Sequence, residues 1–250
     1  MSGINLKTVA IRNVGRVLTL TALALATACA TTPGYVQSAV DSAERPEAHT
    51  ERDANRLPAA VLAMSEVRAG DTVIEFAGFG QYYTTMLSDI VGADGAIYML
   101  DLPYTEERAG DASRAFVASH GNTKYHLEDY NTVALPQNAD LAMNVLYYHD
   151  LPLNDIDTAS LNKRIFGALK PGGIFLIIDH NAEAGSGARD IETLHRIDPA
   201  VIKQEVLAAG FELVEESDLL AHSEDDHSQM VFTPGVRGLT DRTIFKFRKP

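Results

Sequence analysis

Acidic and imidazole side chains recur directly after short apolar runs of this 250-residue sequence. Glu75, Asp101 and Asp129 lie at the ends of three such runs, and the pairs His149-Asp150 and Asp179-His180 follow two more. A carboxylate can accept hydrogen bonds from vicinal hydroxyls, and a histidine beside an acid can accept a proton or ligate a metal ion. If the apolar runs are parallel strands, their carboxyl ends meet at one sheet edge, where α/β proteins bind ligands.

Seven apolar runs supply strands for such a sheet, over residues 72–76, 96–100, 124–127, 140–146, 174–178, 211–215 and 243–247. Helical patterns lie between most of them. The run 174–178 holds no polar residue, which is typical of a strand covered on both faces. The sequence therefore predicts an α/β fold with a doubly wound, mostly parallel sheet and helices on both faces.

The sequence also predicts three helices and some of their boundaries. Apolar residues at helical spacing over 54–64 predict one helix before the first strand. A second helix is expected over 161–169, because the residue before Pro171 is disfavoured in the α region. A third is expected to begin with Asp198 as N-cap and Pro199 in the first turn, and to end at Gly210.

The N-terminus has the composition of an export signal. Residues 1–28 hold three cations and no acid, and end in a twelve-residue apolar run that is too short to span a bilayer core of roughly 30 Å. Cys29 follows Ala26-Thr27-Ala28, which resembles a bacterial lipobox. Residues 1–28 are thus predicted to be a signal peptide, and Cys29 a lipidation site in a periplasm-facing lipoprotein of the cell envelope. Ordinary secretion to the periplasm, or a buried cysteine, are the alternatives.

Residues 29–49 lack apolar periodicity and are expected to form a flexible tether before one domain over 50–250. With 46% hydrophobic and 22% charged residues, the whole chain has an ordinary globular composition. A net charge of −13 repels phosphate backbones, so non-specific nucleic-acid binding is excluded as a function. The single cysteine excludes an intrachain disulfide. The only membrane contact expected is the lipid anchor.

The C-terminal part carries a longer signature. Residues 225–234 read DDHSQMVFTP, residues 237–242 read RGLTDR and residues 246–250 read KFRKP. From about residue 55 onward the chain resembles the class I S-adenosylmethionine-dependent methyltransferases. Within them it is similar to predicted, often exported methyltransferases with a C-terminal RGxTDR…KFRKP signature. The resemblance implies a Rossmann-like fold with seven strands, the last antiparallel, and methyl transfer from S-adenosylmethionine to an unknown small-molecule substrate.

The same resemblance implies roles for individual residues. Glu75 would lie near the methionine amino group, Asp101 would bind the ribose hydroxyls and Asp129 would meet the adenine amino group. The full cofactor-binding set is Glu75, Ala77, Gly78, Gly80, Tyr83, Asp101 and Asp129.

The loop after Glu75 departs from the superfamily pattern. That pattern places glycine at the second, fourth and sixth positions after the acid, where this chain has Ala77, Phe79 and Gln81. Two alternatives follow: a shifted loop that still binds the cofactor, or a loop in which Phe79 and Gln81 fill its space. In the second case the chain would be an exported, non-catalytic protein that binds a small ligand, a metal or an envelope partner.

The catalytic candidates are His149, Asp150, Asp179 and His180, with Asp226 and His227 as further members. In one interpretation His149 or His180 is a general base. In another, Asp150, Asp179 and His180 hold Zn²⁺, Mn²⁺ or Fe²⁺, because Asp150 and Asp179 resemble the metal ligands of catechol-type O-methyltransferases. In a third, these side chains are structural. The glycine-rich loop over 185–187, before His195, is a candidate lid.

Overall fold

The computed structural model describes Met1 and residues 32–250. Apart from Met1, the predicted signal peptide lies outside the described residues, as does Cys29. No helix of the described part is both long enough and apolar enough to cross a membrane.

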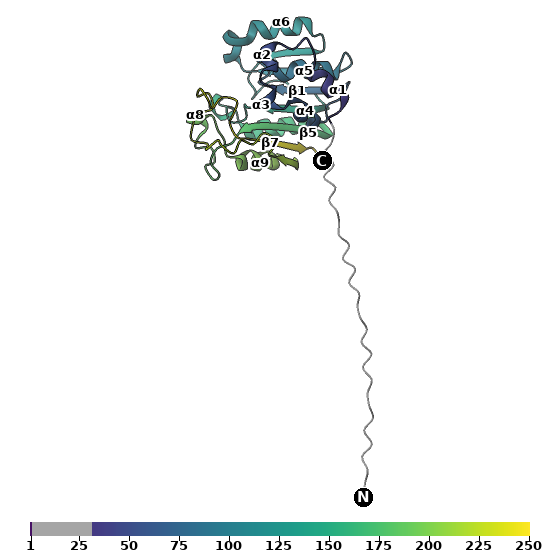
Figure 1. Cartoon of the computed structure of the whole chain (residues 1–250). Helices are drawn as coiled ribbons and strands as arrows, with labels where there is room; N and C mark the ends of the chain where they lie inside the picture. The colour runs from purple at the N-terminus through teal and green to yellow at the C-terminus, as the bar shows by residue number, and fades with distance from the viewer. Residues whose placement is uncertain (2–31) are drawn as a thin grey trace. The chain divides into compact units, whose positions relative to one another are not determined.

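One sheet of seven strands forms the centre of the domain (Figure 1). The strands are β1 (Thr72–Phe76), β2 (Ala96–Asp101), β3 (Thr123–Leu127), β4 (Ala139–Val145), β5 (Leu169–His180), β6 (Glu212–Ser217) and β7 (Arg242–Arg248). Their order is β3-β2-β1-β4-β5-β7-β6. Neighbours among β1–β5 are parallel, and β7 runs antiparallel to both β5 and β6. The predicted fold class is confirmed, including the antiparallel last strand.

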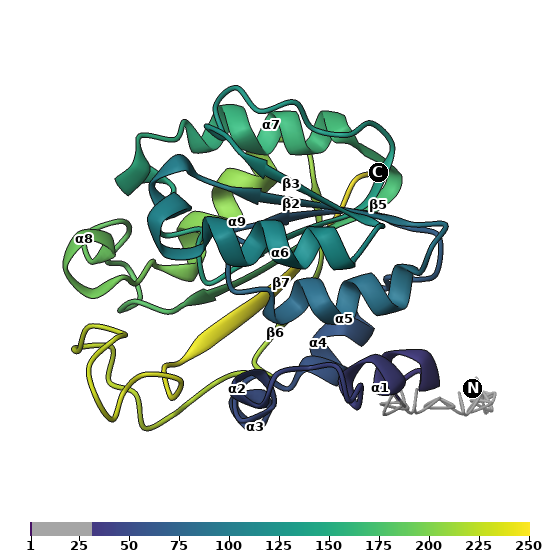
Figure 2. The same ribbon diagram turned by 90° about the horizontal axis from the view of Figure 1, so that it is seen from above.

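Helices cover both faces of the sheet. They are α1 (Gly34–Val40), α2 (Glu47–Thr50), α3 (Asp53–Arg56), α4 (Pro58–Ser65), α5 (Tyr82–Val91), α6 (Asp111–Ser119), α7 (Thr158–Ala168), α8 (Ile191–Leu194) and α9 (Pro199–Ala208). Figure 2 shows α7 on one side of the sheet and α1 and α4 on the other.

The core follows from the alternation of side chains along β5. Ile174, Leu176 and Ile178 join the apolar cluster that contains α1, α4 and α5. Phe175 and Ile177 point the other way, into the cluster that contains α7 and α9. All five side chains are buried, as a strand covered on both faces requires.

The predicted helix over 54–64 is interrupted. Leu57 has φ 43°, ends α3 and precedes α4, which begins at Pro58. Proline disfavours the right-handed helical region for the residue before it, so the apolar spacing continues while the backbone does not. By contrast, the Asp198 N-cap is confirmed, because its carboxylate accepts a hydrogen bond from Ala200 N at 2.9 Å.

The expected end of the second helix is also wrong by one residue. Leu169 has extended backbone angles and pairs with Ala139, so it begins β5 instead of ending α7.

The tether prediction for residues 29–49 is wrong from Gly34 onward. Residues 34–40 form α1, whose Val36 and Ala39 are buried against α4 and α5. Arg45 makes a bidentate ion pair with Asp53 at 2.6 and 2.7 Å. Val36, Ala39 and the partly buried Val40 face this cluster, but α1 has only 7 residues, too short for the spacing to repeat.

Candidate functional site

Glu75 and Asp101 lie near the carboxyl ends of the adjacent strands β1 and β2. Glu75 is 6% exposed and Asp101 is fully buried. Burial raises the pKa of Glu75 to about 8, and the nearby charge of Asp101 adds to this effect. Burial likewise raises the pKa of Asp101 to about 7, against the opposing effects of the Phe79 amide and the Arg108 charge. The predicted pair of acids is thus brought together in a dry environment.

Each of these carboxylates has one oxygen without a donor. Glu75 Oε2 and Asp101 Oδ2 are buried and have no hydrogen-bond partner in the described part of the chain. A buried acceptor without a donor costs free energy, on the order of 1–3 kcal/mol. A ligand rich in N–H and O–H groups would therefore satisfy these two atoms on adjacent strands.

The loop of residues 77–81, called loop one, folds onto these acids. Ala77 N donates to Leu100 O at 2.8 Å and to the Tyr130 hydroxyl at 3.0 Å. Phe79 N donates to Asp101 Oδ1 at 3.0 Å. Gly78 is required by packing, because a Cβ there would lie 2.4 Å from Met99 Cγ.

Two of the three residues that stand at the glycine positions of the pattern, Phe79 and Gln81, hold loop one in this arrangement. Phe79 packs against the α7 side of the core, and Arg108 Cζ lies 4.4 Å from the centroid of its ring. Gln81 Nε2 donates to Phe79 O at 2.8 Å and to Ser113 Oγ at 3.0 Å. In this conformation the Phe79 amide occupies Asp101 Oδ1, and both alternatives for the cofactor site stay open.

A cavity of about 390 Å³ lies beside loop one, not above the acids. Its lining includes Gln81, Thr85, His49 and Phe116, but neither Glu75 nor Asp101.

Three of the predicted cofactor residues, Tyr83, Asp129 and Gly80, are not part of the buried pair of acids. Tyr83 belongs to α5, is 4% exposed and packs in the apolar core. Asp129 is exposed, and its carboxylate accepts a hydrogen bond from Asn131 N at 2.9 Å, closing a local turn. Gly80 is exposed, with open space where a Cβ would lie. Sequence reasoning missed Tyr130, whose hydroxyl links Ala77 N to Leu100 O.

The second predicted constellation is built on a buried histidine–aspartate pair. His149 Nδ1 lies 2.7 Å from Asp179 Oδ1, and His149 N donates to Asp179 Oδ2 at 2.7 Å. Burial opposes protonation of His149, but the charge and hydrogen bond of Asp179 outweigh it and raise its pKa. His149 Nε2 is buried and has no hydrogen-bond partner in the part of the chain that the structure describes.

His180 lies near His149, with ring centroids 5.8 Å apart, but it makes its own hydrogen bonds. Its Nδ1 lies 2.7 Å from Thr240 Oγ1, and its backbone N donates to Asp179 Oδ1. Burial lowers the pKa of His180 to about 3, which keeps the ring neutral. Asp179 and His180 are therefore not arranged with Asp150 as a set of metal ligands, which corrects the predicted trio.

His195 takes the place that the sequence interpretation gave to His180. Its Nδ1 lies 2.9 Å from Asp150 Oδ1, which is itself 3.3 Å from His149 Nε2. Ligand atoms of these three residues, His149, Asp150 and His195, all lie within 4.8 Å of one another. No sequence spacing relates His195 to the other two, since it lies 45 residues after Asp150.

The remaining candidates have structural roles. Asp226 is exposed and accepts hydrogen bonds from Ser228, while His227 Nε2 lies 3.1 Å from Asp241 Oδ2. The adjacent Asp225 holds the fully buried Arg196 by two hydrogen bonds of 2.8 and 2.9 Å. The C-terminal signature therefore anchors the loop that precedes β7.

The candidate lid over residues 185–187 is held by hydrogen bonds to Asp198. Gly185 N donates to the Asp198 carboxylate at 2.8 Å. Figure 1 shows α8 with the surrounding loops at one end of the molecule.

No protein-family model and no curated protein matches this sequence. A methyltransferase dependent on S-adenosylmethionine from Aquifex aeolicus matches with a TM-score of 0.57 at 17% identity, over 82% of this chain and 99% of the other. Fibrillarin from Aeropyrum pernix, with natively bound S-adenosylmethionine, matches with a TM-score of 0.51 at 18% identity, over 78% and 76%.

The [4+2]-cyclase SpnF matches with a TM-score of 0.58 at 19% identity, over 79% of this chain and 81% of that one. These similarities establish architecture, and the cyclase shows that the architecture is not confined to one reaction. The chain has the Rossmann-like fold of the class I S-adenosylmethionine-dependent methyltransferases.

Proposed function

We propose that this protein transfers a methyl group from S-adenosylmethionine to a small-molecule acceptor. The observation that carries the proposal is the pair of buried, unpartnered oxygens on Glu75 and Asp101. They lie at the sheet edge where proteins with this topology bind nucleotides. Membership of the exported methyltransferase family with the RGxTDR…KFRKP signature is part of the same proposal.

The acids fit the cofactor by their chemistry. Asp101 offers Oδ2 as an acceptor for ribose hydroxyls, and Glu75 offers Oε2 for the methionine ammonium group. Donors from a ligand would stabilise the ionised carboxylates and lower both raised pKa values. When bound, S-adenosylmethionine supplies a methyl group on a sulfonium centre. The chain's own contribution is to position the reactants and to exclude water.

Binding also requires loop one to move. Phe79 N already donates to Asp101 Oδ1, and Phe79 packs on the core side of the loop. The binding-competent state is therefore an open form of residues 77–81, and Ala77 and Gln81, at φ 55° and 47°, are strained positions whose release would accompany opening.

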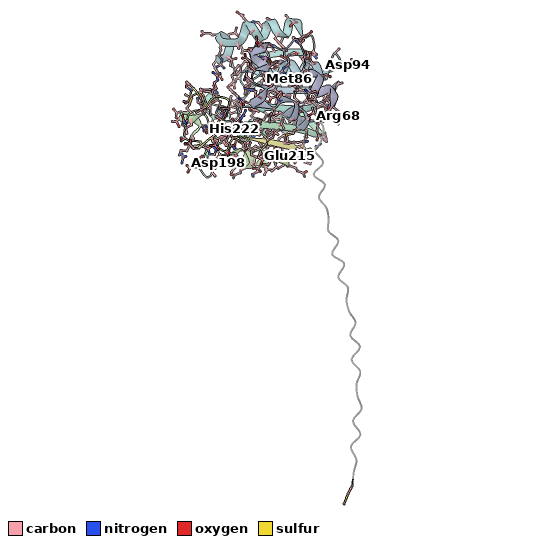
Figure 3. All side chains as sticks on the ribbon, in the orientation of Figure 1. Arg68, Met86, Asp94, Asp198, Glu215 and His222 are labelled. Carbon is pink, nitrogen blue, oxygen red and sulfur yellow. The ribbon has the colours of Figure 1, made fainter. Side chains whose placement is uncertain are left out.

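Calorimetric titration of the purified full-length chain with S-adenosylhomocysteine tests the proposal. We expect saturable binding that weakens by roughly 10-fold or more in Asp101→Asn, because hydrogen bonds to charged groups contribute about 1.5–3 kcal/mol. Asp94→Asn is the matched control, since Asp94 is exposed near the opposite end of β2 (Figure 3). No heat at high micromolar ligand, or equal affinity in both variants, would contradict it.

A second candidate function is a non-catalytic, exported ligand-binding protein of the same fold. It is favoured by the closed loop one, whose amide occupies an oxygen of Asp101. Mass spectrometry of ligands that copurify with the protein separates the two functions. Recovery of S-adenosylmethionine or its demethylated product eliminates the second candidate, whereas a different bound molecule supports it.

We also propose that the protein is exported and anchored in the cell envelope through lipidated Cys29. The charged segment, the short apolar run and the small residues before Cys29 support this. Metabolic labelling with a fatty acid should label the wild-type chain and not Cys29→Ser. Equal labelling of both would refute lipidation at this residue.

A further inference from the structure

We propose that His149, Asp150 and His195 form a binding site for a divalent transition-metal ion of the Zn²⁺ type. The site uses none of the residues assigned to the cofactor, although His149 and Asp150 are also catalytic candidates. Its ligands would be His149 Nε2, one Asp150 carboxylate oxygen and one ring nitrogen of His195. A fourth position stays open for water or a substrate oxygen, which is the pattern of reactive zinc sites.

The separations suit a small ion. Asp150 Oδ1 lies 3.3 Å from His149 Nε2 and 2.9 Å from His195 Nδ1. Donor atoms of a tetrahedral site with bonds of about 2.1 Å are about 3.4 Å apart. An ion can therefore enter this cluster with small side-chain adjustments and without rearrangement of the backbone.

His149 is held as a metal-binding histidine would be. Asp179 accepts from Nδ1 at 2.7 Å and from the backbone N of the same residue, so the ring is fixed. With the proton on Nδ1, the lone pair of Nε2 points into the cluster, where this buried atom has no hydrogen-bond partner among the described residues. Carboxylate–histidine pairs of this kind orient metal ligands in many proteins.

His195 is positioned by its backbone and its neighbour. It has φ 53°, a left-handed conformation that non-glycine residues adopt at a cost. The adjacent Arg196 is fully buried and clamped by the Asp225 carboxylate. The ring of His195 packs near Phe232, with centroids 5.1 Å apart. The strain is thus sustained by a rigid anchor at the next residue.

The donor set indicates the class of ion. Two imidazoles and one carboxylate suit Zn²⁺, Co²⁺ or Fe²⁺, whereas Mg²⁺ and Ca²⁺ require mostly oxygen ligands. Asp179 is not among the three residues whose ligand atoms lie within 4.8 Å of one another, and its oxygens accept hydrogen bonds from His149 and from the backbone N of His180.

The test is a Zn²⁺ titration of the full-length, untagged Cys29→Ser chain after chelation, since the cysteine thiol would compete for the metal. We expect one equivalent to bind and to raise the melting temperature. His195→Ala and Asp150→Asn should each weaken binding by more than about 100-fold, since outer partners alone are worth about 10–100-fold. Visible absorption of the Co²⁺ form should show tetrahedral coordination.

His126→Ala is the matched control. His126 is also a partly exposed histidine paired with a carboxylate, Glu128, at 3.1 Å, but it lies on β3. Its loss should leave Zn²⁺ affinity unchanged. Melting of each variant in chelator checks that it folds. Equal affinity in His195→Ala and in the control, no binding by the parent chain, or displacement of Zn²⁺ by Mg²⁺ would each overturn the proposal and leave the cluster as a hydrogen-bond network.

Discussion

The backbone amide of Phe79 donates a hydrogen bond of 3.0 Å to Asp101 Oδ1. Loop one therefore already occupies one of the two carboxylate oxygens that a ribose would use. A ligand whose two hydroxyls need both oxygens of Asp101 has to compete with this contact. Its apparent affinity is reduced by the fraction of molecules in which loop one is closed. Affinity and loop opening are therefore linked.

Phe79→Gly should tighten binding of S-adenosylhomocysteine. The change removes the aromatic ring that packs on the core and restores a glycine at the fourth position after Glu75. If about one molecule in ten is open in the parent, full opening gains roughly 10-fold in affinity. Calorimetry measures the change, and Phe116→Ala, on α6, serves as the control. Weaker binding in Phe79→Gly would show that the ring supports the ligand.

The contribution of Glu75 and Asp101 to the stability of the ligand-free protein should fall as the pH rises from about 4 to about 8. Folding holds protons on Asp101 and Glu75 over this range, because their pKa values are raised to about 7 and about 8, while the unfolded chain has released them. For Asp101 alone, the loss in the free energy of unfolding is at most about 4 kcal/mol, because each pH unit between 3.8 and about 7 contributes about 1.36 kcal/mol.

Urea unfolding at several pH values measures this slope. The double variant Glu75→Gln/Asp101→Asn should flatten it and be the more stable protein at pH 8. An unchanged slope would mean that these acids are ionised in the folded state.

Asp179→Asn should weaken Zn²⁺ binding by about 10–100-fold without removing a ligand. Asp179 is a positioning residue that fixes the Nδ1 side of His149. The Co²⁺ spectrum should keep its tetrahedral form with a lower affinity. Complete retention of affinity would show that the histidine needs no such support.

Asp225→Asn should lower the free energy of unfolding by about 3 kcal/mol. The fully buried Arg196 loses its charged partner, and uncompensated buried charge costs about 3–5 kcal/mol. Asp226→Asn, at the next residue, should cost less than about 1 kcal/mol, because Asp226 is exposed and contacts only Ser228 in the described structure. Chemical denaturation compares the two, and equal losses would argue against the clamp.

Val36→Ala should destabilise the domain by roughly 2 kcal/mol, because it opens a cavity under α1. Ser38→Ala, at an exposed position of the same helix, should have little effect. Unfolding curves that do not distinguish the two would restore the interpretation of this segment as a tether.

The strands were predictable because apolar runs of β-branched and aromatic residues, bounded by turns, are a local signal. All seven runs became strands, with shifts of a few residues at their ends. Breaks in helices were harder, since Leu57 continues an apolar period while Pro58 ends the helical backbone. Helix α1 was missed because its inward-facing residues, Val36, Ala39 and Val40, span too short a segment for the apolar spacing to repeat.

The site was predictable where it follows from strand ends. Glu75, Asp101, His149 and Asp150 lie at the sheet edge as expected, because topology alone brings them there. His195 was not predictable as a partner of His149, since it is placed by the Arg196–Asp225 clamp, a contact across 29 residues. The closure of loop one depended on the hydroxyl of Tyr130 and the side chain of Gln81, which no spacing rule links to Asp101.

The position of β7 between β5 and β6 sets an order of assembly. β6 precedes β7 in the chain but reaches the sheet only through it. During synthesis, β6 has no strand to pair with until residues 242–248 have been made. A chain that lacks these residues would leave the edge of β5 unpaired and free to pair with strands of other chains. Addition of β7 therefore protects the sheet against aggregation.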